Sequence, residues 1–63
     1  MSDKEALQAC YNRMRQNNYI ADQAYHNGNK GLCKIKENEN LWLHRIYMLA
    51  SVELYRRENE QTN

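Results

Sequence analysis

Residues 41–55, LWLHRIYMLASVELY, decide the fold of this chain. Eleven of these 15 residues are apolar or aromatic, whereas the rest of the 63-residue sequence is strongly polar. On a helix with about 3.6 residues per turn, the apolar side chains form two separate stripes. The wide stripe contains Trp42, Leu43, Ile46, Tyr47, Leu49, Ala50 and Leu54. The narrow stripe contains Leu41, Met48, Val52 and Tyr55.

One neighbouring helix cannot cover both stripes. A helix that is apolar on most of its circumference is usually buried on more than one side, and so short a chain has little other material to cover it. Chains of this size usually depend on disulfides, a metal or oligomerisation. The pattern therefore predicts a homodimer in which the wide stripe packs on a helix of the same chain. The narrow stripe, Leu41, Met48, Val52 and Tyr55, is then the dimer interface; the reverse assignment of the two stripes is the alternative.

The first half of the chain predicts one helix over about residues 3–27. Ser2 and Glu5 have the S-x-x-E spacing of a capping box at a helix start. Apolar residues then recur at three- and four-residue steps along one side, which is typical of a coiled-coil seam. Amides interrupt this seam at Asn17 and Asn18, so the helix either continues with a polar residue that sets the register or breaks there. Because the seam keeps its phase across the amides, we expect continuity.

The segment after this helix predicts a reversal of the chain. Asn27 or Gly28 can adopt the left-handed conformation that ends helices, and we expect a turn and linker over residues 28–37. A short two-stranded ribbon through residues 19–25 and 32–36 is the alternative, because Asn-Gly is also a hairpin signal. Candidate N-cap residues at 37–40 predict a second helix over about residues 38–57, followed by a polar tail at 58–63. We therefore expect an all-α fold: residues 1–63 form a single helical domain, a hairpin that dimerises into a small helical bundle.

Composition and charge exclude several classes of protein. The formal net charge is +1, which argues against a strongly basic nucleic-acid clamp. The apolar segment is shorter than the about 20 residues that span a bilayer, and it contains Arg45 and Glu53, so we expect no membrane span. The start of the sequence does not resemble a signal peptide, and we expect two free thiols in a reducing, cytoplasmic environment.

The residues that carry chemistry do not form a recognisable site. Cys10, His26, Cys33 and His44 lack the paired C-x-x-C and H-x-x-x-H spacings of zinc sites. Neither cysteine has a sequence neighbour that marks it as an activated nucleophile. We expect no metal, no cofactor and no enzymatic activity.

The remaining signals concern surfaces. Tyr19 and Tyr55 fall outside the expected seam and are candidate contacts for a protein partner. The candidate nucleic-acid contacts are the basic residues Arg13, Arg15, Lys30, Lys34 and Lys36. We expect a small regulatory or accessory protein, of phage or plasmid origin, that acts through protein–protein interaction as a homodimer. A nucleic-acid-binding regulator with a basic band across the dimer is the alternative.

Overall fold

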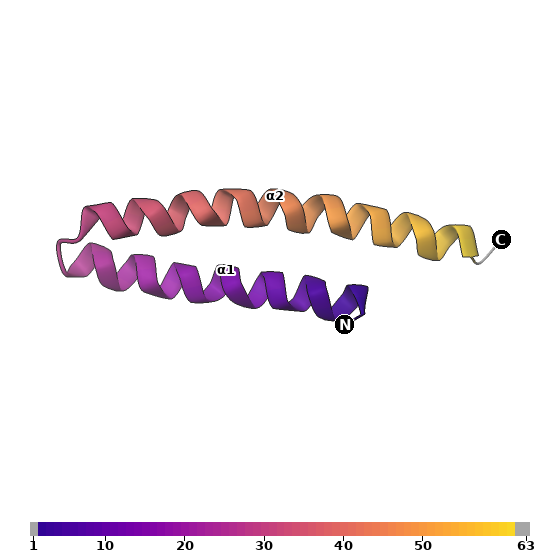
Figure 1. Ribbon diagram of the computed structural model, residues 1–63, viewed down its shortest axis with the longest axis horizontal. Helices are drawn as coiled ribbons and strands as arrows, with labels where there is room; N and C mark the ends of the chain where they lie inside the picture. Colours follow the sequence, from indigo (N-terminus) through magenta and orange to yellow (C-terminus); the bar gives the residue numbers. More distant parts are fainter. Residues whose placement is uncertain (1, 62–63) are drawn as a thin grey trace.

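Two long helices lie side by side in antiparallel directions and form a hairpin (Figure 1). In this computed structural model, which describes residues 2–61, α1 covers Asp3–His26 and α2 covers Lys30–Gln61. The molecule is a rod of 54 × 17 × 14 Å. The described residues contain no strand, so the alternative ribbon over residues 19–25 and 32–36 is replaced by helix. The predicted all-α hairpin is confirmed.

The start and the middle of α1 follow the sequence signals. The Ser2 hydroxyl accepts a hydrogen bond from the backbone N–H of Glu5 over 3.2 Å, as an N-cap residue does. The helix runs without a break through Asn17 and Asn18. Continuity was therefore the correct prediction, and a polar residue, Asn17, occupies the seam.

A compact turn at residues 27–29 ends α1 and starts α2. Gly28 has φ +78°, a left-handed conformation that a side chain would disfavour. The N–H of Gly28 donates to the carbonyl of Tyr25 over 3.1 Å, and the N–H of Asn29 donates to that of Ala24 over 2.8 Å. This pair of bonds is the Schellman arrangement, which satisfies carbonyls at a helix end. Of the two candidates, Gly28 rather than Asn27 takes the left-handed conformation.

The start of α2 corrects the predicted linker over residues 28–37. Asn29 caps the helix, since its Oδ1 accepts from the N–H of Leu32 over 3.2 Å and its carbonyl accepts from the N–H of Cys33 over 3.2 Å. Asn29 therefore completes the end of one helix and begins the next. The turn is complete at Asn29, so α2 starts at Lys30 and residues 30–37 are helical.

The C-terminal end of α2 also extends past the predicted limit of about residue 57. Residues 58–61 of the predicted polar tail are helical, and residues 62–63 lie outside the described part of the chain. Two ion pairs tie this end to the start of α1: Arg57 to Asp3, and Lys4 to Glu58, each with an N···O distance of 3.6 Å. Figure 1 shows α2 continuing beyond the N-terminal end of α1.

The less exposed residues of both helices form a regular hairpin seam with alternating steps of three and four residues. On α1 the seam contains Leu7, Cys10, Met14, Asn17, Ala21 and Ala24. On α2 it contains Cys33, Lys36, Asn40, Leu43, Tyr47, Ala50 and Leu54. This spacing is that of antiparallel coiled-coil packing. The seam takes Leu43, Tyr47, Ala50 and Leu54 from the wide stripe, and leaves Trp42, Ile46 and Leu49 exposed.

The core that this seam encloses is small. In the described part of the chain the buried apolar residues are Ala21 and Ala24, with 8% and 4% of their surface exposed. The remaining apolar seam residues are only partly covered. Within residues 2–61, neither helix combines the length and the apolar character needed to cross a membrane.

Candidate functional site

The outer face of α2, which points away from α1, carries most of the exposed apolar surface. The narrow stripe predicted as the dimer interface lies there, and its side chains are 50–70% exposed. A second group of exposed residues, the outer stripe, consists of Ile35, Trp42 and Leu49, which are spaced seven residues apart and are 61–67% exposed. Large apolar groups normally occupy the seam of a helical hairpin, whereas here they also occupy the opposite side.

Arg45 lies between the two stripes and leans on one of them. Its guanidinium carbon is 5.7 Å from the centre of the Trp42 ring, a cation–π distance. This position covers part of the outer stripe and leaves the narrow stripe open. A shallow depression on the same face is lined by Asn38, Leu41, Trp42, His44, Arg45, Met48 and Leu49.

The outer face of α1 has the opposite character. It is polar, with an exposed hydrogen bond from Gln8 Nε2 to Asn12 Oδ1 over 3.0 Å. Tyr19, predicted as a partner contact, is 68% exposed. Tyr55, the other predicted contact, lies near the open end of the hairpin, about 21 Å from Tyr19 along the axis at 1.5 Å per residue. The structure therefore does not bring these two tyrosines together.

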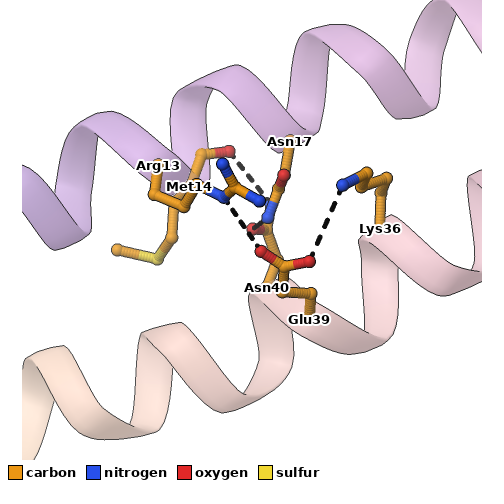
Figure 2. Close-up of polar contacts among 6 residues, drawn as sticks. All are labelled: Arg13, Met14, Asn17, Lys36, Glu39 and Asn40. Carbon is orange, nitrogen blue, oxygen red and sulfur yellow. Dashed lines mark hydrogen bonds and ion pairs between the residues drawn. The ribbon is translucent and has the colours of Figure 1, made fainter.

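A polar cluster crosses the seam near the middle of the hairpin (Figure 2). Asn17 is completely buried, and its Nδ2 donates to Asn40 Oδ1 over 3.0 Å. Asn40 Nδ2 donates to the carbonyl of Met14 over 3.1 Å and to Asn18 Oδ1 over 2.8 Å. The Oδ1 atom of Asn17 is buried without a hydrogen-bond partner among the described residues. Buried amides of this kind fix the register of a coiled coil at some cost in stability.

Charges extend this polar cluster to the surface. Arg13 Nε donates to Glu39 Oε1 over 3.0 Å, and Lys36 Nζ lies 3.7 Å from Glu39 Oε2 (Figure 2). The Asn17 amide and then the Arg13 guanidinium hold the pKa of Glu39 below its usual range. The ionised form of Glu39 is therefore favoured, and its ion pair with Arg13 connects α2 to α1.

The predicted nucleic-acid contacts do not form one continuous basic surface. Arg13 and Lys36 are both engaged by Glu39. Within residues 2–61, Arg15, Lys30 and Lys34 have no carboxylate partner, and they are distributed between the middle of α1 and the start of α2. The cations that remain for phosphate groups are therefore few and dispersed.

The two cysteines and the two histidines lie at different places along the hairpin. Cys10 lies in the seam, where its thiol contacts the carbonyl of Leu43 at 3.5 Å, and Cys33 lies near the turn beside Glu37. His26 is 3.4 Å from Asp22, and His44 is exposed on α2. In the described part of the chain no three His, Cys, Asp or Glu side chains are grouped to hold a metal, and both thiols are free.

Sequence reasoning missed the roles of two polar residues that organise the hairpin: Asn29, which caps α2, and Asn40, which was a candidate N-cap residue and lies instead in the seam. The signal for Asn40 was present, because Asn40 continues the three- and four-residue steps of the seam backward from Leu43. Asn17 likewise lies at a seam position, on α1. Two amides at seam positions of two antiparallel helices predict a contact between them.

A groove between the helices is the remaining concave feature near the open end of the hairpin. Its floor is apolar, and its rim carries the charged residues Asp3, Glu53 and Arg57. Arg57 bonds to both carboxylates, at 3.6 Å to Asp3 and 3.3 Å to Glu53. The three charged groups at the rim are thus paired with one another, and the free thiol of Cys10 also lines the groove.

Comparison with known proteins adds no relative to this picture: no protein-family model, no curated protein and no solved structure gives a significant match to the chain.

Proposed function

We propose that this chain is a non-enzymatic interaction module that works as a homodimer, with the narrow stripe of α2 as the dimer interface. The observation that carries the proposal is the exposure of this stripe on a helix whose other side already packs on α1. Large apolar residues at four positions on one helix face exceed what a small polar protein usually leaves in water. A second copy of the chain supplies the cover.

The spacing of the stripe fits an antiparallel pair of α2 helices, and a parallel pair fits it equally. Leu41, Met48 and Tyr55 are each seven residues apart, so a twofold axis at Met48 places Leu41 of one copy opposite Tyr55 of the second. Val52 fills the space beside this row with the spacing of a coiled coil. The resulting assembly has the two α2 helices at its centre and the two α1 helices outside.

The chemistry of the described residues suits binding rather than catalysis. The charged groups at the groove are paired with each other, and the free thiols suit a reducing compartment such as the cytoplasm. The dimer therefore acts by presenting surfaces to another macromolecule. A protein is the favoured partner, since Glu39 forms ion pairs with two of the five candidate phosphate contacts.

Nucleic-acid binding is the second candidate. The observation in its favour is that Lys30 and Lys34 follow one another at a four-residue step near the turn, without a carboxylate partner in residues 2–61. A dimer doubles these charges. Fluorescence anisotropy with labelled RNA and DNA tests this function, and affinity that falls steeply as salt is raised would support it.

Sedimentation equilibrium tests the dimer. The wild-type chain is expected to sediment at twice its monomer mass at micromolar concentration. The substitutions Met48→Glu and Val52→Glu together place four carboxylates in the proposed interface of the dimer, and this variant is expected to sediment as a monomer.

A matched variant controls for the added charge. Gln8→Glu and Gln16→Glu add the same charge to the polar outer face of α1 and are expected to leave the mass at that of a dimer. A wild-type monomer at this concentration, or an unchanged mass for the Met48→Glu/Val52→Glu variant, would show that the narrow stripe is not the interface.

A further inference from the structure

The outer stripe remains uncovered after both the hairpin and the proposed dimer have formed. At about 100° per residue, the centre of Ile35, Trp42 and Leu49 lies about 110° around α2 from the centre of the narrow stripe. Arg45 lies between them and stacks on Trp42. A second α2 helix seated on the narrow stripe therefore leaves the outer stripe facing solvent.

The two edges of the outer stripe differ in charge. Arg45 lies on one edge, and Lys34 lies farther round the helix on the same side, in line with Leu41 and Met48. Neither forms an ion pair with a carboxylate within residues 2–61. The carboxylates on the other edge, Glu39 and Glu53, are already engaged. Glu39 binds Arg13 and Lys36, and Glu53 binds Arg56 at 2.6 Å and Arg57 at 3.3 Å. The stripe thus combines an apolar centre with one free cationic edge.

We infer that the outer stripe is a docking site for an amphipathic helix of a partner protein, with acidic side chains along one edge of its apolar face. The three apolar residues span about 21 Å of α2 at 1.5 Å per residue, the length of two heptads. Seven-residue spacing is the pattern that a second helix matches with its own apolar side chains. Acidic groups on that helix would pair with Lys34 and Arg45.

This inference rests on the proposed function, because it names the partner that the dimer binds. It also assigns the contact to α2 rather than to Tyr19 on α1. Two features of α1 argue for a helix of a different protein over another copy of this chain. The seam side of α1 is already occupied, and its outer face is polar, so α1 of a second copy offers no apolar row to the stripe. Association of α2 with α2 through this stripe is one outcome that the test detects.

Trp42 provides a probe inside the site, because it is the single tryptophan of the chain and is 65% exposed. The ligand is a synthetic peptide of about three heptads with Leu at the a and d positions, Glu at the g positions and uncharged Gln at the e positions, so that one edge alone is acidic. A matched peptide carries Lys in place of Glu. We expect the acidic peptide to shift the Trp42 emission to shorter wavelength with saturation, and the basic peptide to bind at least tenfold more weakly.

Three variants locate the contact. Leu49→Ser is expected to abolish the shift and Arg45→Glu to weaken binding of the acidic peptide about tenfold while improving that of the basic one. Tyr19→Ser, which removes an equally exposed side chain from α1, is expected to bind like the wild type. Circular dichroism and sedimentation establish that each variant keeps the helicity and mass of the wild type.

Several results would overturn the inference. These are no change in Trp42 emission with the acidic peptide, equal binding of the two peptides, or loss of binding on Tyr19→Ser. A fall in mass for Leu49→Ser would show that the stripe holds a second copy of the chain. The mass of the wild type and its peptide binding, measured together, separate the two proposals: peptide binding by a wild-type monomer would refute the dimer alone, and a wild-type dimer that does not bind the peptide would refute the docking site alone.

Discussion

Asn17 of α1 and Asn40 of α2 meet across the hairpin, with Asn17 Nδ2 donating to Asn40 Oδ1 over 3.0 Å. This contact is the polar layer in a seam whose other positions are mostly apolar or small. A shift of one helix by a heptad would place each amide opposite an apolar residue and leave its hydrogen bonds unmade. Such a shift costs free energy, since buried amides need partners. The pair therefore specifies one register for two helices that bury few apolar side chains.

Removal of Asn40 is expected to be costly. In Asn40→Ala, the completely buried Asn17 loses its hydrogen bond to the amide of Asn40, and we expect the free energy of unfolding to fall by about 1–3 kcal/mol. Urea denaturation at a fixed protein concentration measures this value. Asn38→Ala, an exposed substitution on the same helix with the same change in helix propensity, is the control and should change stability by less than about 0.5 kcal/mol. Equal effects of the two substitutions would contradict a special role for Asn40.

Glu39 is expected to make stability depend on pH. Its folded-state pKa is held below the usual range by Asn17 and Arg13, so the folded state favours the ionised carboxylate. Its contribution is present above the ordinary glutamate pKa of about 4.3 and is lost as pH falls through the lower folded-state pKa. Thermal melts of the wild type and Glu39→Gln should differ most near about pH 6 and converge in acid.

The control for this titration is Glu60→Gln, which removes an exposed carboxylate near the end of α2. It should follow the wild type over the whole pH range. A difference between the wild type and Glu39→Gln that stays constant from neutral pH into acid would mean that the effect of the substitution does not come from the charge of Glu39.

The parts of the fold that the sequence predicted have local signals. Ser2 and Glu5 mark the start of α1, and the phase of the apolar residues marks its continuity through Asn17. The start of α2 could not be placed in the same way, because Lys36 and Asn40 continue the seam with polar side chains. Apolar periodicity alone therefore predicts a start near residue 38, whereas α2 starts at Lys30.

The candidate site was predictable in outline for a related reason. Periodicity identified Leu41 and Met48 as one stripe, and both are exposed in the hairpin. It also placed Trp42 and Leu49 in the stripe expected to pack on the first helix. A single antiparallel neighbour covers only a narrow sector of α2, which these two side chains do not reach. How much of a stripe a neighbour covers depends on tertiary geometry, which the sequence does not state.

The two glycines are expected to respond to alanine with opposite signs. Gly28 has φ +78°, and Gly28→Ala should destabilise the hairpin by about 1–2 kcal/mol, because a Cβ disfavours this conformation. Gly31 lies within α2, where an added Cβ would be 3.8 Å from Asn29 Oδ1, an ordinary contact. Gly31→Ala should therefore stabilise by about 0.5–1 kcal/mol. Urea denaturation of both variants measures the two changes, and a shared sign would contradict the described turn.

The thiol of Cys33 is expected to react slowly with alkylating reagents. Burial raises its pKa, and so do the hydrogen bond to Glu37, the charge of Glu37 and the charge of Asp22. The Sγ–Oε1 distance to Glu37 is 3.5 Å. Because the thiolate is the reactive form, Glu37→Gln should lower the pKa and speed alkylation by iodoacetamide near about pH 8. Cys10→Ala serves as the background so that Cys33 is the thiol measured, and Glu60→Gln in that background should leave the rate unchanged. A rate that does not rise with Glu37→Gln would show that the carboxylate does not control this thiol.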